Sequence, residues 1–237
     1  GMGLLAGQLY AKEGYNVALV DINKEALDKC VAEIAAYPAN VIGIAIDIRD
    51  YKKVEEARDR TVEAFGSIDI LINFAGGAET RICGASGAFF DIPIEVYDFG
   101  IDVNLKGAIY FDHAVMAQMA KQKSGVIVHL GSITGEEGCG CNIAYSASKS
   151  ALMNGVTKSI ALAGAPFHIT SNAVCPGNIL TPMGKTLSWS KKDPKTYIPA
   201  GRYGTAEDIA NAVLFYASDL SDYVTGDYMN VNGGLYM

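Results

Sequence analysis

Charged residues are scarce in this sequence of 237 residues. Asp, Glu, Lys and Arg make up 19% of it, below the ~25% that is usual in globular domains, while 50% of it is hydrophobic. This composition excludes an intrinsically disordered chain and predicts a large buried core. Basic residues are the scarcer of the two signs, 19 against 26 acidic ones. The resulting net charge of -7 argues against a nucleic-acid partner or an anionic membrane surface.

Long hydrophobic runs are also missing, because none approaches the ~18 residues that a transmembrane helix needs. The first residues lack the basic start and cleavage site of a secretory signal. Cysteine occurs five times, an odd number in a chain too long to need disulfide bonds, which favours reduced thiols. We therefore expect a cytoplasmic protein without a membrane partner, folded as one domain over residues 1–237.

Short β-branched runs alternate with longer amphipathic stretches along the chain. The expected strands are residues 17–21, 41–47, 68–73, 126–130, 169–175 and 228–231. The expected helices are residues 4–13, 24–36, 51–65, 96–104, 105–122, 144–162 and 205–217, with a break near 104–107. Apolar strands that alternate with helices predict an α/β fold, a doubly wound and mostly parallel sheet with helices on both faces.

Tyr145 and Lys149 stand at positions i and i+4 near the start of an expected helix, so their side chains lie on one helix face. A free tyrosine has a pKa of ~10, too high to exchange protons readily at neutral pH. A nearby ammonium favours the phenolate and lowers that pKa, which suits a proton donor and acceptor for a carbonyl/alcohol pair. A plain surface pair is the alternative.

Ser132 lies just past an expected strand, where an open parallel sheet presents groups to ligands. Its segment, Gly131-Ser132-Ile133-Thr134-Gly135, is not the Gly-x-Ser-x-Gly pattern of a nucleophile elbow. The three histidines of the chain form no convincing Ser-His-Asp arrangement either. Ser132 is therefore expected to donate a hydrogen bond to a substrate oxygen, an ordinary turn residue being the alternative.

Together with other segments, these residues resemble motifs of the short-chain dehydrogenases/reductases. The segments follow the family's order: Gly1-Met2-Gly3, Asn73-Phe74-Ala75-Gly76, Val103-Asn104-Leu105-Lys106-Gly107, Ser132, Tyr145 with Lys149, Pro176-Gly177-Asn178-Ile179-Leu180-Thr181, and Gly233-Gly234. The resemblance spans essentially the whole chain. It implies a Rossmann-like NAD(P)-binding oxidoreductase that transfers a hydride between its nicotinamide cofactor and a secondary alcohol or ketone. Phe74 departs from the pattern, which has a second Asn there.

The resemblance assigns catalytic roles to four residues. Tyr145 is expected to be the general acid/base, and Lys149 to lower its pKa and hold the nicotinamide ribose. Ser132 is expected to orient the substrate carbonyl or hydroxyl. Asn104 is expected to keep a water in a proton relay behind Lys149, and a kink there would explain the break between the two expected helices.

The resemblance also implies which residues contact the cofactor. They are Gly1, Met2, Gly3, Asp21, Ile22, Asp47, Ile48, Asn73, Ala75, Gly76, Tyr145, Lys149, Pro176, Gly177, Ile179 and Thr181. The carboxylate of Asp21 can accept hydrogen bonds from both ribose hydroxyls and would repel a 2′-phosphate, and no Arg follows it. We therefore expect NAD, with NADP the less favoured choice. A role for Asp21 as a helix cap is compatible with either.

One part of the family pattern has no counterpart before Gly1, namely the first strand and the first glycine of the phosphate turn. A central parallel strand is hard to lose, because its neighbours would keep unpaired backbone groups. We therefore expect the natural protein to have roughly fifteen more residues, enough for a strand and a turn.

The resemblance implies that the substrate site is shaped by the loop between Ser132 and Tyr145 and by the loop over residues 182–204, and the latter is longer than a plain connection needs. Substrate contacts are predicted for Ser132, Glu136, Asn142 and Tyr145. Their polarity favours a polyol, a sugar or a sugar acid. The alternative is a larger apolar alcohol, such as a hydroxysteroid or a 3-oxoacyl group, because Met and Trp residues stand in the loop.

Three further points complete the expectations. Cys139 and Cys141 have no His or further Cys pair near them, so no metal site is expected. A dinucleotide-binding regulatory protein or a methyltransferase with a similar sheet would not need the Tyr-x-x-x-Lys pair. Family resemblance also predicts a homo-tetramer or homo-dimer, with interfaces on the helices at 105–122 and 144–162 and on the C-terminal segment.

Overall fold

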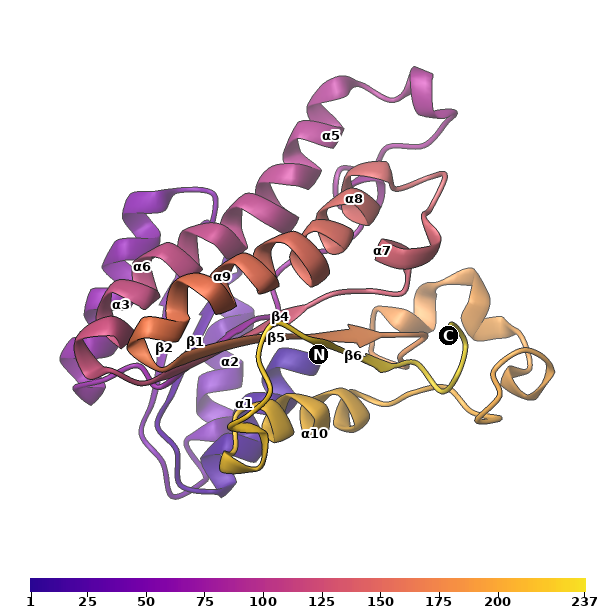
Figure 1. Ribbon diagram of the computed structural model, residues 1–237. Coiled ribbons are helices and arrows are strands. Elements are labelled where there is room, and N and C mark those ends of the chain that lie inside the picture. The colour runs from indigo at the N-terminus through magenta and orange to yellow at the C-terminus, as the bar shows by residue number, and fades with distance from the viewer.

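Six strands in parallel pairs form the centre of the computed structural model, which describes residues 1–237 (Figure 1). They are β1 (Val17–Asp21), β2 (Val41–Ala45), β3 (Ile70–Asn73), β4 (Gly125–Leu130), β5 (Ile169–Pro176) and β6 (Tyr228–Val231). Every strand that the sequence predicts is present, with small shifts at the ends. Their carboxyl ends point to the same edge, as parallel pairing requires.

The strands form two sheets, β1-β2 and β3-β4-β5-β6. β1 pairs only with β2, and β3 pairs only with β4. The facing edges of β1 and β3 therefore share no ladder of backbone hydrogen bonds. Leu19 of β1 and Ile72 of β3 still pack on one apolar cluster around Tyr10 and Ile34. This arrangement agrees with the prediction that residues 1–237 contain no counterpart of the family's first strand.

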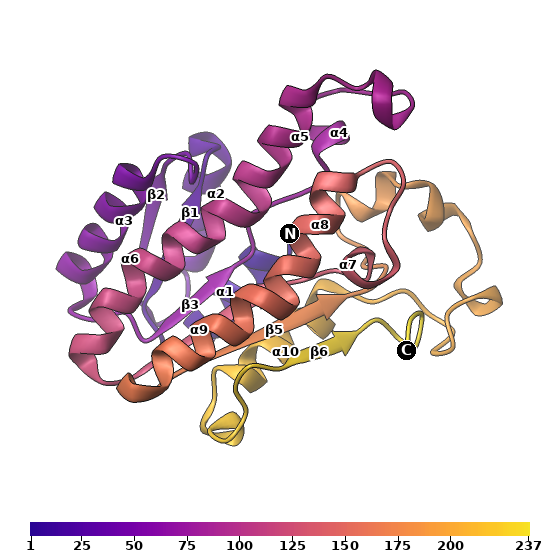
Figure 2. The ribbon, with the colours of Figure 1, turned by 45° about the horizontal axis from the view of Figure 1, so that its top comes forward.

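Helices cover both faces of the sheets (Figures 1 and 2). One face carries α3 (Tyr51–Phe65), α6 (Gly107–Gln122) and α9 (Thr157–Gly164), and the other carries α1 (Met2–Lys12), α2 (Lys24–Ile34) and α10 (Ala206–Tyr216). The remaining helices are α4 (Glu79–Ile82), α5 (Ile94–Ile101), α7 (Thr134–Glu137) and α8 (Ile143–Ala151). The doubly wound α/β arrangement expected from the sequence is therefore confirmed. No helix combines the length and the apolar character that crossing a membrane requires.

Two helices on one face contain π-helical turns. The first, η2 (Asp102–Lys106), joins α5 to α6 and falls where the sequence predicts a break. The second, η3 (Leu152–Val156), joins α8 to α9 inside the stretch expected to be one helix. Turns of this kind are frequent at functional sites. Here Asn104 lies within the first, and the second begins three residues after Lys149.

A buried polar network connects the sheet to α6 and α9. Asp112 accepts a hydrogen bond from the amide of Asn73 at 2.9 Å and lies 3.0 Å from Nε2 of His129. Nδ1 of His129 lies 3.0 Å from the hydroxyl of Thr157, which donates to the carbonyl of Leu152 at 2.6 Å. Because that hydroxyl proton is used, Nδ1 must be the donor to Thr157. Asp112 and His129 are both fully buried, so water does not compete for these contacts.

We expect Asp112→Ala to lower the free energy of unfolding by about 3 kcal/mol, because it leaves His129 and Asn73 buried without their partner. Urea unfolding followed by circular dichroism measures the change. Asp28→Ala on the exposed face of α2 is the matched control and should change stability by less than about 0.5 kcal/mol. Equal stability of the two variants would contradict the role given to the network.

Short 3₁₀ turns and internal hydrogen bonds give segment 182–204 a local structure of its own. The turns are η5 (Gly184–Thr186), η6 (Ser188–Lys191) and η7 (Pro194–Thr196). The hydroxyl of Tyr203 lies 2.6 Å from the carbonyl oxygens of both Trp189 and Lys192. The ring of Trp189 packs against that of Tyr203, with 5.2 Å between the centroids. The stretch expected to be irregular is therefore a folded segment.

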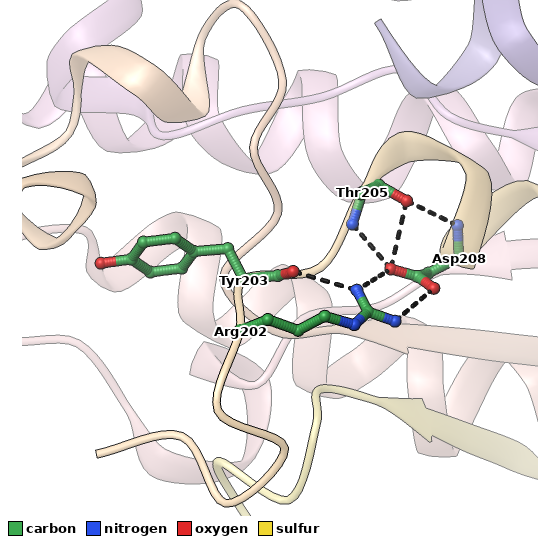
Figure 3. A network of polar contacts seen from close by, with 4 residues as sticks. All are labelled: Arg202, Tyr203, Thr205 and Asp208. Atoms are coloured by element: carbon green, nitrogen blue, oxygen red, sulfur yellow. Dashed lines mark hydrogen bonds and ion pairs between the residues drawn. The ribbon is translucent and has the colours of Figure 1, made fainter. Parts of the chain in front are cut away.

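An ion pair anchors the end of this segment to α10 (Figure 3). Arg202 donates to both carboxylate oxygens of Asp208, at 2.7 and 2.9 Å. Asp208 also accepts from the backbone N–H of Thr205 at 2.8 Å, completing a capping box at the first turn of α10. Hydrogen bonds from Arg202 hold the pKa of Asp208 well below its usual range. The anchor therefore persists at mildly acidic pH.

Candidate active site

The four residues expected to be catalytic come from elements that meet at the carboxyl ends of the strands. Ser132 follows β4, Tyr145 and Lys149 lie in α8, and Asn104 lies in η2. Gly76, in the loop after β3, lies between two of them and has a φ of +143°. A Cβ at this position would lie 3.6 Å from Nζ of Lys149 and would collide with Oδ1 of Asn104. Only glycine allows this close approach.

Lys149 and Tyr145 lie on one face of α8, as their spacing predicts. Nζ of Lys149 is 5.6 Å from the centroid of the Tyr145 ring. Lys149 is 3% exposed, and its ammonium donates to the carbonyl of Leu130, the last residue of β4, at 2.6 Å. An ammonium has three N–H donors, so two of them have no acceptor within the protein. These two donors are available to a bound ligand.

Burial controls the protonation of both groups. It lowers the pKa of Lys149 to about 8. It raises the pKa of Tyr145, against the opposing effect of a hydrogen bond between the phenol and Ser132. The expectation that Lys149 brings the Tyr145 pKa below its ordinary value is therefore wrong for the protein alone, because desolvation outweighs the lowering effect of the Ser132 hydrogen bond. At neutral pH the site holds a neutral phenol beside an ammonium.

Thr134 makes Ser132 a hydrogen-bond donor. Oγ of Ser132 accepts from the backbone N–H of Thr134 at 3.2 Å and from its hydroxyl at 2.9 Å. Since both lone pairs of the Ser132 oxygen are used, its own proton is free to reach Tyr145 or a substrate oxygen. This geometry suits the donor role expected for Ser132. No sequence pattern marked Thr134, because its partner is defined only by the shape of the turn.

Glu79 fixes the start of α8 and was missed by the sequence analysis. Its side chain in α4 is fully buried, and its two oxygens accept from the backbone N–H groups of Ala144 at 3.0 Å and Tyr145 at 3.1 Å. A carboxylate at this point satisfies free N–H groups and faces the positive end of the helix dipole. Glu79 therefore positions the backbone that carries Tyr145.

The Asn104 side chain binds neighbouring backbone. Its Oδ1 accepts from the N–H of Gly77 at 2.8 Å, and its Nδ2 donates to the carbonyls of Gly77 and Gly100, both at 2.9 Å. The residue is 1% exposed. Its amide therefore holds the loop after β3 against η2, and its role in a water relay stays a prediction.

The two remaining substrate-site candidates have partners inside the protein. Glu136 is half-buried, with Oε1 3.9 Å from the sulfur of Cys175. Asn142 uses its amide oxygen to accept from the hydroxyl of Thr80 at 2.5 Å, and its amide nitrogen contacts two cysteine sulfurs. Both ends of the Asn142 amide are thus engaged, and substrate binding by these two residues stays a prediction.

Residues 176–181 lead from β5 into segment 182–204. Pro176 ends the strand, and a Cβ on Gly177 would lie 2.7 Å from Cβ of Asn232, so the loop passes close to the end of β6. Ile179 is buried, and the hydroxyl of Thr181 accepts from the N–H of Gly184 at 3.0 Å. The predicted cofactor segment therefore also forms the first anchor of segment 182–204.

Asp47 and Ile48, both expected to contact the cofactor, lie just past the end of β2. Arg49 donates to both carboxylate oxygens of Asp47, at distances from 2.6 to 3.0 Å, and these hydrogen bonds lower the pKa of Asp47. A Cβ on Gly107 would lie 2.6 Å from the side chain of Ile48, so Ile48 packs closely on the start of α6. Contacts of Asp47 and Ile48 with a cofactor stay predictions.

The start of α1 and the end of β1, next to β2, suit a dinucleotide. Helix α1 has no side-chain cap and no acidic residue in its first turn, so its N–H groups suit a phosphate. A Cβ on Gly3, in that turn, would lie 3.4 Å from the ring of Phe74. The exposed Asp21 uses one oxygen to accept from the N–H of Asn23 at 2.9 Å, leaving the other free for a ribose hydroxyl. The cap of α2 is Asn23, so capping does not explain Asp21.

The chain is similar to known proteins over nearly its whole length. A family model described as enoyl-(acyl carrier protein) reductase matches residues 1–236. The chain is 36% identical to the 3-oxoacyl-[acyl-carrier-protein] reductase FabG of Thermotoga maritima, over 99% of this chain and 93% of that one. It is 37% identical to FabG of Staphylococcus aureus, over 100% of this chain and 94% of that one. The crystal structure of NAD+-bound xylitol dehydrogenase matches with a TM-score of 0.87 at 30% identity, covering 98% of this chain and 94% of that one.

Fold and site thus define a nicotinamide-dependent oxidoreductase with a Rossmann-like sheet. The chain belongs to the short-chain dehydrogenase/reductase family.

We expect Lys149→Met to make the ligand-free protein more stable at pH 7, by about 1–3 kcal/mol, because it removes a buried charge with a single partner. The pKa of Lys149 is about 8 in the folded protein, and the ordinary value of 10.5 applies to the unfolded chain. Between these values the unfolded chain binds more protons, so wild-type stability rises with pH and the advantage of the variant shrinks. Urea unfolding at pH 7 and pH 10 measures both effects.

Lys158→Met is the matched control for this prediction, since Lys158 is exposed in the following helix. The free energy of unfolding of Lys158→Met should differ from that of the wild type by the same amount at pH 7 and at pH 10. A Lys149→Met protein that is less stable than the wild type at pH 7 would show that the ammonium is not a net cost to folding.

Proposed function

We propose that this protein reduces the 3-oxo group of an acyl substrate to a hydroxyl, and catalyses the reverse oxidation of that alcohol. The observation that carries the proposal is the meeting of three groups at one strand end. A Ser132 hydroxyl with a free proton, the Tyr145 phenol and the buried Lys149 ammonium lie together there. This set serves a carbonyl oxygen that must gain a proton, a need that a binding protein without activity does not have.

Each group has a distinct task in the reduction. The bound nicotinamide supplies the hydride. Ser132 donates a hydrogen bond to the ketone oxygen and holds it beside the phenol. Tyr145 transfers its proton to that oxygen as negative charge develops there. The Lys149 ammonium stabilises the phenolate that remains, and its two unused N–H donors hold the ribose. Asn104 is assigned the water of the proton relay behind it.

The substrate class draws support from two sources. Two nearly full-length relatives are named for 3-oxoacyl groups held on a carrier protein. Segment 182–204 carries five basic residues against one acidic residue in an otherwise acidic chain. Its four lysines, Lys185, Lys191, Lys192 and Lys195, are all exposed. Such a surface suits a substrate delivered on an anionic carrier. A 3-oxoacyl group, the alternative to a polyol in the sequence analysis, is therefore favoured.

A polyol remains the second candidate. The structure of NAD+-bound xylitol dehydrogenase is similar over nearly the whole chain. The half-buried carboxylate of Glu136, four residues after Ser132, is a group that binds hydroxyls well. The substrate assay described below separates the two candidates directly.

Assembly and cofactor complete the proposal. We assign residues 1–237 to one NAD(P)-binding domain, with segment 182–204 over the substrate. Exposed apolar side chains such as Leu162 and Phe167, at the end of α9 and just beyond it, support a homo-dimer or homo-tetramer. Asp21 supports NAD, because its carboxylate would repel a 2′-phosphate and the nearest basic residue in the chain, Lys24, is already paired with Asp28.

The function is tested by following NADH oxidation with acetoacetyl-coenzyme A, and NAD reduction with xylitol. We expect turnover of the 3-oxoacyl thioester, and a Tyr145→Phe variant that loses at least ~100-fold in kcat while still binding NADH. Tyr223→Phe, at a fully exposed position, is the control and should keep its activity. Turnover of xylitol alone would favour the polyol. Reduction of crotonyl-coenzyme A in place of the 3-oxoacyl thioester would show an enoyl reductase and overturn the proposal.

Cofactor choice has its own test. We expect Asp21→Ser to change the ratio of kcat/KM for NADPH to that for NADH by at least ~10-fold in favour of NADPH, because it removes the charge that repels a 2′-phosphate. Asp28→Ser, an exposed carboxylate on α2, is the control and should leave the ratio unchanged. A wild-type protein that already prefers NADPH would refute the assignment.

A further inference from the structure

Two cysteine thiols touch each other in the turn that leads into α8. The sulfurs of Cys139 and Cys141 are 3.4 Å apart. The backbone N–H of Asn142 donates to the carbonyl of Cys139 at 3.2 Å and closes a four-residue turn around the pair. A disulfide bond is ~2.05 Å long, so the sulfurs need to approach by about 1.4 Å. Only a tightening of one turn separates the two states.

The surroundings of the turn allow that approach. Gly138, with a φ of +80°, precedes the pair, and Gly140 lies between the two cysteines. A Cβ at either glycine would meet nothing within 4 Å, so the backbone has room to move. Cys141 is exposed and Cys139 is partly exposed, so small oxidants reach the sulfurs. The other cysteines have no sulfur neighbour of this kind.

The two thiols are chemically unequal. Burial acts to raise the pKa of Cys139, but hydrogen bonds from Cys141 and Asn142 outweigh it and lower that pKa. The hydrogen bond to Cys139 raises the pKa of Cys141. The amide nitrogen of Asn142 lies 3.8 Å from the first sulfur and 3.3 Å from the second, as a donor to both. One sulfur is thus the more readily ionised nucleophile, and the other is a thiol in contact with it.

We propose that Cys139 and Cys141 form a dithiol modification site that hydrogen peroxide oxidises reversibly to a disulfide. The Cys139 thiolate attacks one oxygen of the peroxide, the O–O bond breaks, and the departing hydroxide takes up the proton that the thiol released, so that a sulfenic acid and one water are formed. The sulfur of Cys141 then attacks the sulfur of Cys139, the S–S bond forms, and the S–O bond breaks to release a second water. Two thiols lose two hydrogens, and one peroxide is reduced to two waters. A dithiol reductant reverses the step.

Oxidation at this site acts on Tyr145, which lies four residues after Cys141 in the first turn of α8. Burial is the main cause of the raised pKa of Tyr145, and the negative charge of a Cys139 thiolate adds to it. A disulfide carries no charge, so its formation removes this opposition to the phenolate. The N-terminal end of α8 begins at Asn142, so tightening of the turn also acts on the helix. This consequence rests on the proposed function, whereas the disulfide itself does not.

The modification is tested by mass spectrometry on the full chain. Treatment with equimolar hydrogen peroxide, followed by alkylation and digestion, should give a peptide with both cysteines that has lost two hydrogens, about 2 Da. Dithiothreitol should restore it. Cys141→Ser should instead accumulate a sulfenic acid at Cys139 that dimedone traps, and Cys83→Ser, which removes another exposed cysteine, should behave as the wild type. Sulfinic acid at one cysteine, or disulfides only between chains, would overturn the proposal.

The effect on the site has a separate readout. Peroxide should move the pH profile of kcat for alcohol oxidation to lower pH in the wild type, and dithiothreitol should move it back. A variant with both Cys139→Ser and Cys141→Ser should have a profile that peroxide does not change. An unchanged wild-type profile despite a disulfide in the mass spectrum would refute the link to Tyr145. An absence of all turnover would refute the proposed function and leave the mass result to decide the modification.

Discussion

The arrangement of the site depends on an ammonium placed where water is excluded. Lys149 has a single acceptor in the protein, the carbonyl of Leu130, and burial alone would favour its loss of charge. The group keeps its place because its backbone belongs to α8 and its acceptor ends a central strand. Its position is therefore set by a helix and a sheet that pack together. Little solvent screens a charge held in this way, so it can stabilise a phenolate that forms beside it during the reaction.

Several polar contacts serve this placement without being part of the reaction. Glu79 binds the first backbone N–H groups of α8, and Thr134 occupies the lone pairs of Ser132. Below them, Asp112 and His129 connect β3 and β4 to the helices on one face. Each contact joins elements far apart in the chain, so each limits how far the site can relax. The rigidity needed for proton transfer is thus distributed over the surrounding structure.

The sequence predicted the features that depend on local pattern. All six strands are visible as β-branched runs, and the pair Tyr145 and Lys149 is visible from its spacing along a helix. The break at residues 104–107 is also present, as a π-helical turn. These features were accessible because side-chain period and spacing encode them.

Features that depend on burial or on distant partners were missed. Glu79 is an unremarkable glutamate in sequence, and its partners lie 65 and 66 positions away. The direction of the Tyr145 pKa depends on how much solvent the fold removes, which no motif encodes. The second π turn and the engagement of Asn142 by Thr80 likewise appear only once the elements have packed.

The folded structure of segment 182–204 has a consequence for the affinity with which the site binds its ligand. Its carbonyls are already paired through Tyr203, and its two ends are tied down by Thr181 and by the pairing of Arg202 with Asp208. A flexible flap would lose conformational entropy on closing over a ligand, and affinity would fall accordingly. This segment is already ordered in the folded protein, so it loses little further conformational entropy when a ligand binds beneath it.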